Sequence, residues 1–387
     1  MSKGRQISGE FSFLRDVIRS YLGMTGGLPQ RCYPWNRITR RAATEGLAGL
    51  CYEVLLEEKF IVPAWVDQFF RFIYFENVAR YMRCEKALSA LLLGVDQPVI
   101  VLKGMALVPR FYHATGLRGF SDLDVLVRAN DGAKFVDAVK RLGYRIAESE
   151  HQLQDADGVQ LDIHTDLFGF GRIQSRKFAV RMNEDLPWTK TRQLSIQQSR
   201  ALCLEPELEI LYLCYHMVKH SFLKLIWAVD IAKILLTYKN QFRWDYFIDL
   251  AQDSNLNVFS YYGLHFTNEI ASGLVPRDRL EQLMTFQSNA LQSSMYRAVV
   301  QGDKVQQFAE LFFISSIQSG AKKLAFIREV VAPAAPVRKQ IVRNNAASQL
   351  KIGFYPIRFF QMARIGLSWA MALVRNFSFR WNFKFSE

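Results

Sequence analysis

Two kinds of hydrophobic periodicity divide this 387-residue chain. Residues 10 to 90 and residues 205 to about 315 carry apolar side chains at steps of three and four, which predicts amphipathic helices. Between these regions, PVIVL at 98–102, SDLDVLV at 121–127 and VQLDIHTDL at 159–167 are short β-branched or alternating runs, which predict strands. Strands in the middle with helices on both sides predict an α+β fold built on a small mixed sheet.

We therefore expect four regions: an N-terminal helical region at 1–94, an α/β core at 95–200, a C-terminal helical region at 201–319 and a basic, aromatic-rich tail at 320–387. Within the core, residues 130–142 begin with Asn-Asp and end before Gly143, as a helix does. Residues 144–150 and 151–157 predict two further strands, and the Pro- and Ala-rich APAAPVRK at 332–339 predicts a hinge before the last basic portion.

Two carboxylates stand close together inside an apolar run. On a strand, Asp122 and Asp124 project to the same face, while the apolar residues between and after them face the other way. Their mutual repulsion is removed by a divalent cation, and Mg²⁺ or Mn²⁺ prefers hard oxygen ligands of this kind. Asp162, in a strand that can pair beside the first, would complete the metal site, with Asp166 as a competing third carboxylate. The alternative is a set of solvated charges at strand ends.

A phosphate site is predicted just before these carboxylates. Lys103 and Gly104 lie at a strand-to-helix turn, where backbone amides favour phosphate and a glycine allows close approach. Lys103 adds a positive charge, and Arg118 is a second candidate phosphate ligand. The alternative for the first pair is a strand exit followed by a helix cap.

Histidines and a tryptophan in the next helical region form a second group of candidates. His164 shares a strand face with Asp162 and would orient a ligand or an acceptor, or serve as a structural histidine. His216 and His220 are four residues apart on one helix face, but the sequence HMVKH lacks the glutamate of a HExxH zinc site. We expect them to contribute to an acceptor pocket or to structure, with Trp227 and Asp230 packing against their helix.

Four of these segments occur in an order that resembles a known family. Lys103-Gly104, the run from Arg118 to Asp124, Asp162 to His164, and His216 to His220 followed by Trp227 and Asp230 resemble the uncharacterised nucleotidyltransferase family, within the superfamily that includes DNA polymerase beta. The resemblance covers about residues 35 to 260. The chain departs from the wider superfamily by carrying Lys-Gly where Gly-Ser is usual.

The resemblance implies an enzyme that transfers a nucleoside monophosphate from an NTP, ATP among the candidates, to an acceptor and releases pyrophosphate. It implies that Asp122, Asp124 and Asp162 are catalytic and hold Mg²⁺ or Mn²⁺. It also implies that Lys103, Gly104 and Arg118 bind the nucleotide. Two alternatives stay open: a non-catalytic nucleotide-binding or membrane-peripheral partner in polysaccharide or peptide modification, and a nucleic-acid-tailing enzyme. The sequence predicts neither the acceptor nor the oligomeric state.

Cysteine usage and hydropathy predict the cellular setting. Five cysteines without a CxxC pair predict reduced thiols in a cytoplasmic protein. The N-terminus has no apolar segment typical of a signal peptide, and no stretch is apolar over the length of a membrane span.

The tail carries most of the positive charge of the chain. Residues 320–387 hold 12 Lys or Arg against two acids, which accounts for +10 of the net +13. Residues 357–375 can form a helix with arginines beside Phe and Trp, which is typical of a helix lying on an anionic membrane. We expect membrane association through residues 350–387. The alternatives are a helix packed on the protein and a nucleic-acid surface.

Overall fold

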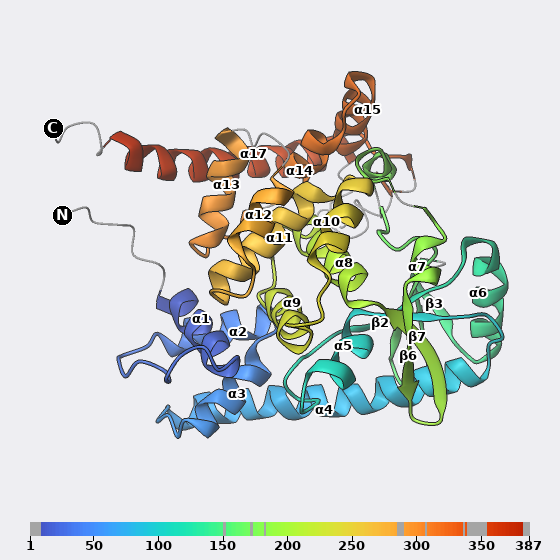
Figure 1. Ribbon diagram of the computed structural model, residues 1–387, viewed down its shortest axis with the longest axis horizontal. Coiled ribbons are helices and arrows are strands. Elements are labelled where there is room, and N and C mark those ends of the chain that lie inside the picture. Colours follow the sequence, from blue (N-terminus) through green and yellow to red (C-terminus); the bar gives the residue numbers. More distant parts are fainter. Residues whose placement is uncertain are drawn as a thin grey trace.

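The computed structural model describes residues 9–149, 152–170, 173–181, 183–284, 290–305, 308–335, 337–338 and 354–381. The described strands form one seven-stranded sheet. Figure 1 shows helices around this sheet and the long C-terminal helix across the molecule from it. The predicted α+β class, with a mixed sheet between helical regions, is confirmed.

The N-terminal region is helical, as predicted. Its helices are α1 (Gly9–Tyr21), α2 (Trp35–Thr44), α3 (Ala48–Glu57) and α4 (Ala64–Leu93). The long helix α4 runs under both the N-terminal helices and the sheet (Figure 1), because its first half packs on α2 and α3 and its second half on the strands. The N-terminal helices are therefore joined rigidly to the sheet.

The sheet has the strand order β3-β4-β5-β2-β1-β7-β6. The strands are β1 (Ile100–Leu102), β2 (Asp122–Leu126), β3 (Arg145–Ser149), β4 (Gln152–Gln154), β5 (Gln160–His164), β6 (Thr191–Ile196) and β7 (Ser199–Leu204). At the centre, β2 is parallel to β5 and antiparallel to β1, and β1 is parallel to β7. The sheet is thus mixed, with the predicted carboxylate strands β2 and β5 paired directly.

Alternation along the central strands gives the sheet two different faces. Leu123 and Val125 of β2 pack with α4 and with α6 (Gly132–Arg141), close to the helix predicted at 130–142. Leu126 and the other side chains of the opposite parity face the larger core under the C-terminal helices. Asp122 and Asp124 share that parity, so they lie on the face covered by the C-terminal helices.

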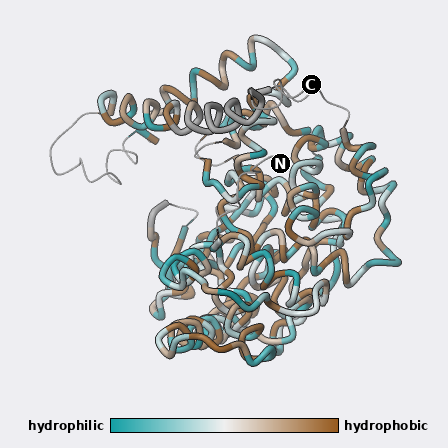
Figure 2. Tube along the Cα trace, turned by 90° about the vertical axis from the view of Figure 1, so that its left-hand side faces the viewer, coloured by the Kyte–Doolittle hydropathy of each residue, from teal (hydrophilic) through white to brown (hydrophobic). Residues whose placement is uncertain are grey.

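Short helices link the strands. They are α5 (Lys103–Phe111), η1 (Ala129–Asp131), η2 (Gln174–Ala179) and α7 (Leu186–Thr189). The C-terminal helices are α8 (Pro206–Lys219), α9 (Ile226–Thr237), α10 (Trp244–Asp253), α11 (Asn257–Ile270), α12 (Arg277–Leu283), α13 (Ala290–Val300), α14 (Ala309–Ser316), α15 (Gly320–Val331) and α17 (Phe354–Trp381). Figure 2 shows hydrophilic and hydrophobic residues alternating along the helical parts of the trace, as expected when a helix buries one side.

The hairpin β6–β7 was not predicted, and it extends the sheet to Leu204, beyond the expected end of the core at residue 200. Its two-residue turn is Gln197-Gln198, and Gln197 adopts a left-handed φ of 50°. Hairpin turns with positive φ usually carry Asn-Gly or Asp-Gly, so the local sequence signal for this hairpin is missing.

The predicted tail helix at 357–375 lies within α17. This helix packs against α13, and Ile357 and Ile365 are its two buried side chains among those described. Residues 336, 339–353 and 382–387 of the tail lie outside the described residues. Within the described ranges, none of the helices has the length and apolar content needed to cross a bilayer.

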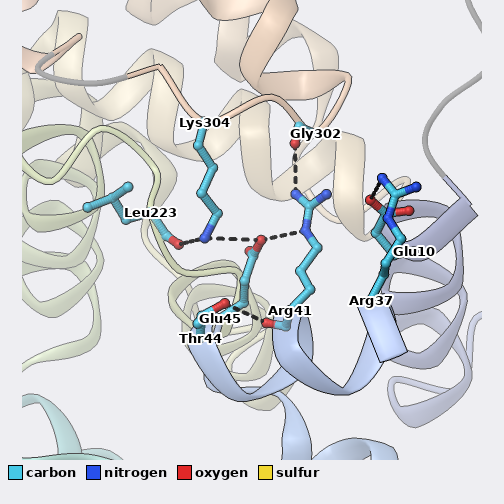
Figure 3. A network of polar contacts seen from close by, with 8 residues as sticks. All are labelled: Glu10, Arg37, Arg41, Thr44, Glu45, Leu223, Gly302 and Lys304. Carbon is cyan, nitrogen blue, oxygen red and sulfur yellow. Dashed lines mark hydrogen bonds and ion pairs between the residues drawn. The ribbon is translucent and has the colours of Figure 1, made fainter. Parts of the chain in front are cut away.

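A partly buried network of polar contacts joins the N-terminal helices to the C-terminal ones (Figure 3). Glu45, which follows α2, is 2% exposed and pairs with Arg41 at 2.7 Å and with Lys304 at 3.5 Å. Arg41 also donates to the carbonyl of Gly302 at 2.8 Å, and Lys304 donates to the carbonyl of Leu223 at 3.3 Å. The loops at 45–46, 223–226 and 302–304 are therefore fixed together at one edge of the site described next.

Candidate active site

The parallel pairing of β2 and β5 brings two of the predicted carboxylates together. Asp124 lies opposite Asp162 in the register, and both point from the same face of the sheet. His164, two residues beyond Asp162, turns to the same carboxylates: its Nε2 is 3.0 Å from Asp124 Oδ1 and 3.6 Å from Asp162 Oδ2. The candidate site is therefore built on the two central strands.

The turn after β1 adds a cation to this group. Leu102 lies opposite Asp124, so the next residue, Lys103, begins α5 beside that carboxylate. Lys103 Nζ donates to Asp124 Oδ1 at 2.5 Å. Lys103 has a left-handed φ of 48°, a strained conformation for a residue with a side chain, and such strain is concentrated at functional sites.

Burial and charge together set the protonation of this pair. Burial opposes ionisation of Asp124, but Lys103 and the hydrogen bond from His164 outweigh it and lower the pKa of Asp124 to about 2. Burial likewise opposes the charge of Lys103, and the carboxylates of Asp124 and Asp122 raise the pKa of Lys103 above its usual value. Burial raises the pKa of Asp162, against the effect of His164. Asp124 and Lys103 therefore form a fully charged pair on the sheet.

The donor set at this point fits a divalent cation. One ligand atom each from Asp124, Asp162 and His164 can be chosen so that all lie within 4.8 Å of one another. Two carboxylate oxygens suit Mg²⁺ and Mn²⁺, and an imidazole adds affinity for transition metals. Asp122 does not belong to this group. Its Oδ1 accepts a hydrogen bond from Ser121 at 2.9 Å at the start of β2, although it lines the same cavity.

Arg118 pairs with Asp230 and not with the carboxylates of β2 and β5. Its guanidinium makes a bidentate pair with Asp230 of α9, at 2.9 Å from Nε to Oδ1 and 2.8 Å from Nη2 to Oδ2. Tyr112 donates to the same carboxylate at 2.7 Å, and both partners of the ion pair are almost fully buried. The pair fixes the loop that leads into β2. Arg118 borders the cavity, and its role as a phosphate ligand stays a prediction.

Gly104 lies under an aromatic ring. A Cβ at this position would meet the ring of Phe120 at 2.5 Å, so the absence of a side chain makes room for Phe120. Gly104 is buried at the N-terminal end of α5 and lines the cavity. Its predicted contact with phosphate is not tested by this packing.

A cavity of about 950 Å³ opens over these residues. The central strands and the turn after β1 contribute the three carboxylates, His164 and Lys103, and helices α8 and α9 contribute the opposite wall. On that wall the ring centroids of His216 and His220 lie 4.5 Å apart, and the ring centroid of Trp227 lies 4.8 Å from that of His216. The structure thus brings the predicted histidines and Trp227 to the same cavity as the carboxylates, whereas Asp230 lies behind the wall, bound to Arg118.

The two histidines of this wall are held uncharged. Burial, with the nearby Lys103, lowers the pKa of His216 well below its usual value, and burial with Lys219 lowers that of His220 to about 3. In the described part of the chain, no third donor joins them in a group that could hold a metal. Their chemistry is therefore that of neutral hydrogen-bonding rings beside an aromatic surface.

Three further cavity residues were not predicted from the sequence. Tyr212 and Lys219 of α8 and Lys224 before α9 line the same wall. Lys219 donates to the carbonyl of Gly169, and burial, with the repulsion of Arg176, lowers the pKa of Lys219 to about 8. The signal was available, because Tyr212 and Lys219 lie four residues before and three residues after His216. They thus recur at the spacing of one helix face.

Comparison with known proteins identifies the family of the chain. A family model described as "Uncharacterised nucleotidyltransferase" matches residues 32–272, more than half of the chain. The chain belongs to this family. The resemblance inferred from the order of the motifs is confirmed, and the match spans every site residue that was predicted from the sequence. No curated protein matches the chain.

Among solved structures, the chain is similar to an antigenic nucleotidyltransferase-like protein from Paracoccidioides brasiliensis. The sequence identity is 11%, the match covers 45% of this chain and 88% of that one, and the TM-score is 0.30. This likeness is weak and adds nothing to the assignment, which depends on the family model. Family membership supports a nucleotidyltransferase type of function, and the cluster of Asp124, Asp162 and His164 lies within the matched residues.

Proposed function

We propose that this chain is a metal-dependent nucleotidyltransferase that moves a nucleoside monophosphate from an NTP to a hydroxyl-bearing acceptor. One observation carries the proposal: Asp124 and Asp162 face each other across paired strands, next to Lys103, in the wall of a cavity large enough for a nucleotide. A solvated strand end would not place a second carboxylate, an imidazole and a buried ammonium around the same oxygen atoms.

The roles follow from position. Asp124 and Asp162, with His164 beside them, would hold Mg²⁺ or Mn²⁺. Asp122 lies outside this group but lines the same cavity, and it would be a further ligand for an ion that is bound together with the nucleotide. When bound, such an ion stabilises negative charge on the transferring phosphoryl group and on the leaving pyrophosphate. Lys103 would bind the triphosphate once its ammonium is released from Asp124.

The proposed chemical step is a displacement at the α-phosphorus of the NTP. The acceptor oxygen forms a bond to the α-phosphorus, and the bond from that phosphorus to the α–β bridging oxygen breaks. Pyrophosphate leaves with the bonding electron pair. The acceptor proton passes to the carboxylate of Asp162, whose raised pKa makes it the better base of the pair. The neutral rings of His216 and His220 and the indole of Trp227 would orient the acceptor or the base.

The test uses NTPs labelled at the α-phosphate, with Mg²⁺ or Mn²⁺ and a cell extract as the source of acceptors. We expect pyrophosphate release and label transfer, and mass spectrometry of the labelled species would identify the acceptor. Asp124→Asn and Asp162→Asn should each abolish transfer. Asp185→Asn, which removes a carboxylate paired with Arg128 outside the cavity, should leave it unchanged. Full transfer by Asp124→Asn would refute the proposal.

The same assay separates the alternatives. NTP binding without turnover, for every acceptor source, would favour the hypothesis of a non-catalytic nucleotide-binding protein. Label found on RNA or DNA, with binding that weakens steeply as salt rises, would favour nucleic-acid tailing. The described structure contains no observation that favours either one over transfer to another acceptor.

A further inference from the structure

The two helices at the C-terminal end expose an unusual set of large apolar side chains. We call the following residues of α15 and α17 the tail surface: Leu324, Ile327, Val331, Tyr355, Phe359, Phe360 and Leu367. Phe360 is 72% exposed and Phe359 is 69% exposed. Single exposed apolar residues are normal on a protein, but seven on two neighbouring helices are typical of a surface that binds a partner or a membrane.

The two helices are held together where they meet. Arg358 of α17 donates to the carbonyl of Val330 in α15, and Arg338 donates to the hydroxyl of Tyr355 at 3.4 Å. With Ile357 and Ile365 turned inward, α17 presents its other side to the surroundings. The exposed apolar side chains of α17 therefore lie on the side away from its buried residues, and the Arg358 contact joins α17 to the end of α15.

The charge of this region is strongly positive. Arg328 and Arg364 are exposed on these two helices, and Lys322, also exposed, lies with its ammonium 5.3 Å from the ring centroid of Phe178. Glu329 is the one acid in α15 and α17, and it is engaged, since it accepts hydrogen bonds from the backbone of Gln174 at 2.9 Å and Ser175 at 2.8 Å. No acidic side chain of these helices is thus available to repel an anionic partner.

We propose that the tail surface docks on an anionic lipid bilayer, with α15 and α17 lying in the plane of the headgroups. Exposed Phe and Leu side chains would enter the boundary of the acyl chains, and the cations would contact the headgroups. Nucleic acid fits less well, because three of the seven side chains carry rings for base stacking and the other four are aliphatic: Leu324, Ile327, Val331 and Leu367. A second copy fits less well too, because two such surfaces would bring like charges together.

The helices of the tail surface also lie next to the cavity. Glu329 holds the backbone of Gln174, and Gln174 lines the cavity. Val337, between α15 and α17, lines it as well. Docking would therefore bring the bilayer near the cavity, while the seven tail-surface residues lie outside the cavity lining. The docking proposal does not depend on the proposed catalysis, so either can fail without the other.

The experiment is flotation of the full chain with vesicles of phosphatidylcholine, with and without phosphatidylglycerol. We expect binding to the anionic vesicles and little to the neutral ones, and a loss of binding as salt rises. The variant Phe359→Ser, Phe360→Ser, Leu367→Ser should weaken binding about tenfold or more, because the inserted apolar area is lost. Replacing one exposed cation by Ser should weaken it about fivefold.

A matched control exists on α4. Phe72, Phe75 and Met82 are also exposed, at 62%, 53% and 63%, so the variant Phe72→Ser, Phe75→Ser, Met82→Ser removes as many apolar side chains from another surface. All six positions are exposed, so both variants should fold, which circular dichroism would verify. The control should bind anionic vesicles as the unmodified chain does.

Three results would overturn the proposal. The first is that the full chain stays unbound with anionic vesicles, whatever else it binds, including single-stranded oligonucleotides. The second is that the tail variant floats as well as the unmodified chain. The third is that the α4 control loses as much binding as the tail variant, which would mean general adhesion of exposed apolar residues. Dimers that the tail variant disrupts, seen by light scattering without vesicle binding, would assign the surface to a second copy.

Discussion

Replacing Arg118 with Met tests whether this residue acts on structure or on phosphate. The variant removes a guanidinium that makes two hydrogen bonds to Asp230, in a pair whose side chains are 4% and 0% exposed. Asp230 would keep one donor, the hydroxyl of Tyr112. Removing one partner of a buried ion pair costs about 3–5 kcal/mol, because the remaining charge stays buried without compensation. We expect the free energy of unfolding of Arg118→Met to fall by that amount.

The assay is unfolding in urea, with the double variant Arg118→Met, Asp230→Asn as the comparison. The amide introduced by Asp230→Asn carries no charge and its oxygen still accepts the hydroxyl of Tyr112. The double variant should therefore recover most of the loss and lie within about 1–2 kcal/mol of the unmodified chain. A single variant within about 1 kcal/mol of the unmodified chain would contradict the buried-pair assignment. If the double variant is stable but binds NTP more weakly, Arg118 also contacts phosphate.

Three further predictions concern the carboxylate cluster. Lys103→Met should weaken NTP binding but strengthen Mn²⁺ binding in the absence of NTP, because the ammonium no longer occupies Asp124 Oδ1. Calorimetry would measure both affinities, and weaker Mn²⁺ binding would contradict the idea that Lys103 and the metal compete for Asp124. His164→Asn should lower Mn²⁺ affinity about 10–100-fold and Mg²⁺ affinity less, because an imidazole favours transition metals; equal losses would mean that His164 is not a ligand. The pKa of Asp124 is lowered from the usual 3.8 to about 2, so its ionised form adds about 2 kcal/mol to the free energy of unfolding. This contribution is complete above pH 3.8 and is lost as the pH falls through 2. Urea midpoints from pH 5 to pH 2 should therefore fall less in Asp124→Asn than in the unmodified chain.

The sequence was sufficient to predict the central strands and the cluster of charges on them. Alternation around Asp124 and around Asp162 identified two strands with polar residues on one face, and their pairing brings those residues together. The hairpin β6–β7 escaped prediction because its Gln-Gln turn carries no local signal. Elements with a strong periodicity of their own were therefore predictable, whereas those that depend on their neighbours were not.

The contacts of Arg118 show the same limit for the site. Its partner Asp230 is 112 residues away, and nothing in the local sequence distinguishes an arginine that binds phosphate from one that binds a buried carboxylate. The cavity wall has a similar origin. Tyr212 and Lys219 share a helix face with His216, but only the packing of α8 over the sheet turns that face toward the carboxylates. Long-range packing decides such assignments.

The walls of the cavity come from positions as distant as Gly46 and Val337. The chain must therefore be synthesised as far as Val337 before the cavity around Asp124 and Asp162 can be complete. A truncated chain that ends before α8 would contain β2 and β5 but would lack the helices that form the opposite wall of the cavity. Expression of the central segment by itself would therefore give the paired strands without the helices that complete the cavity.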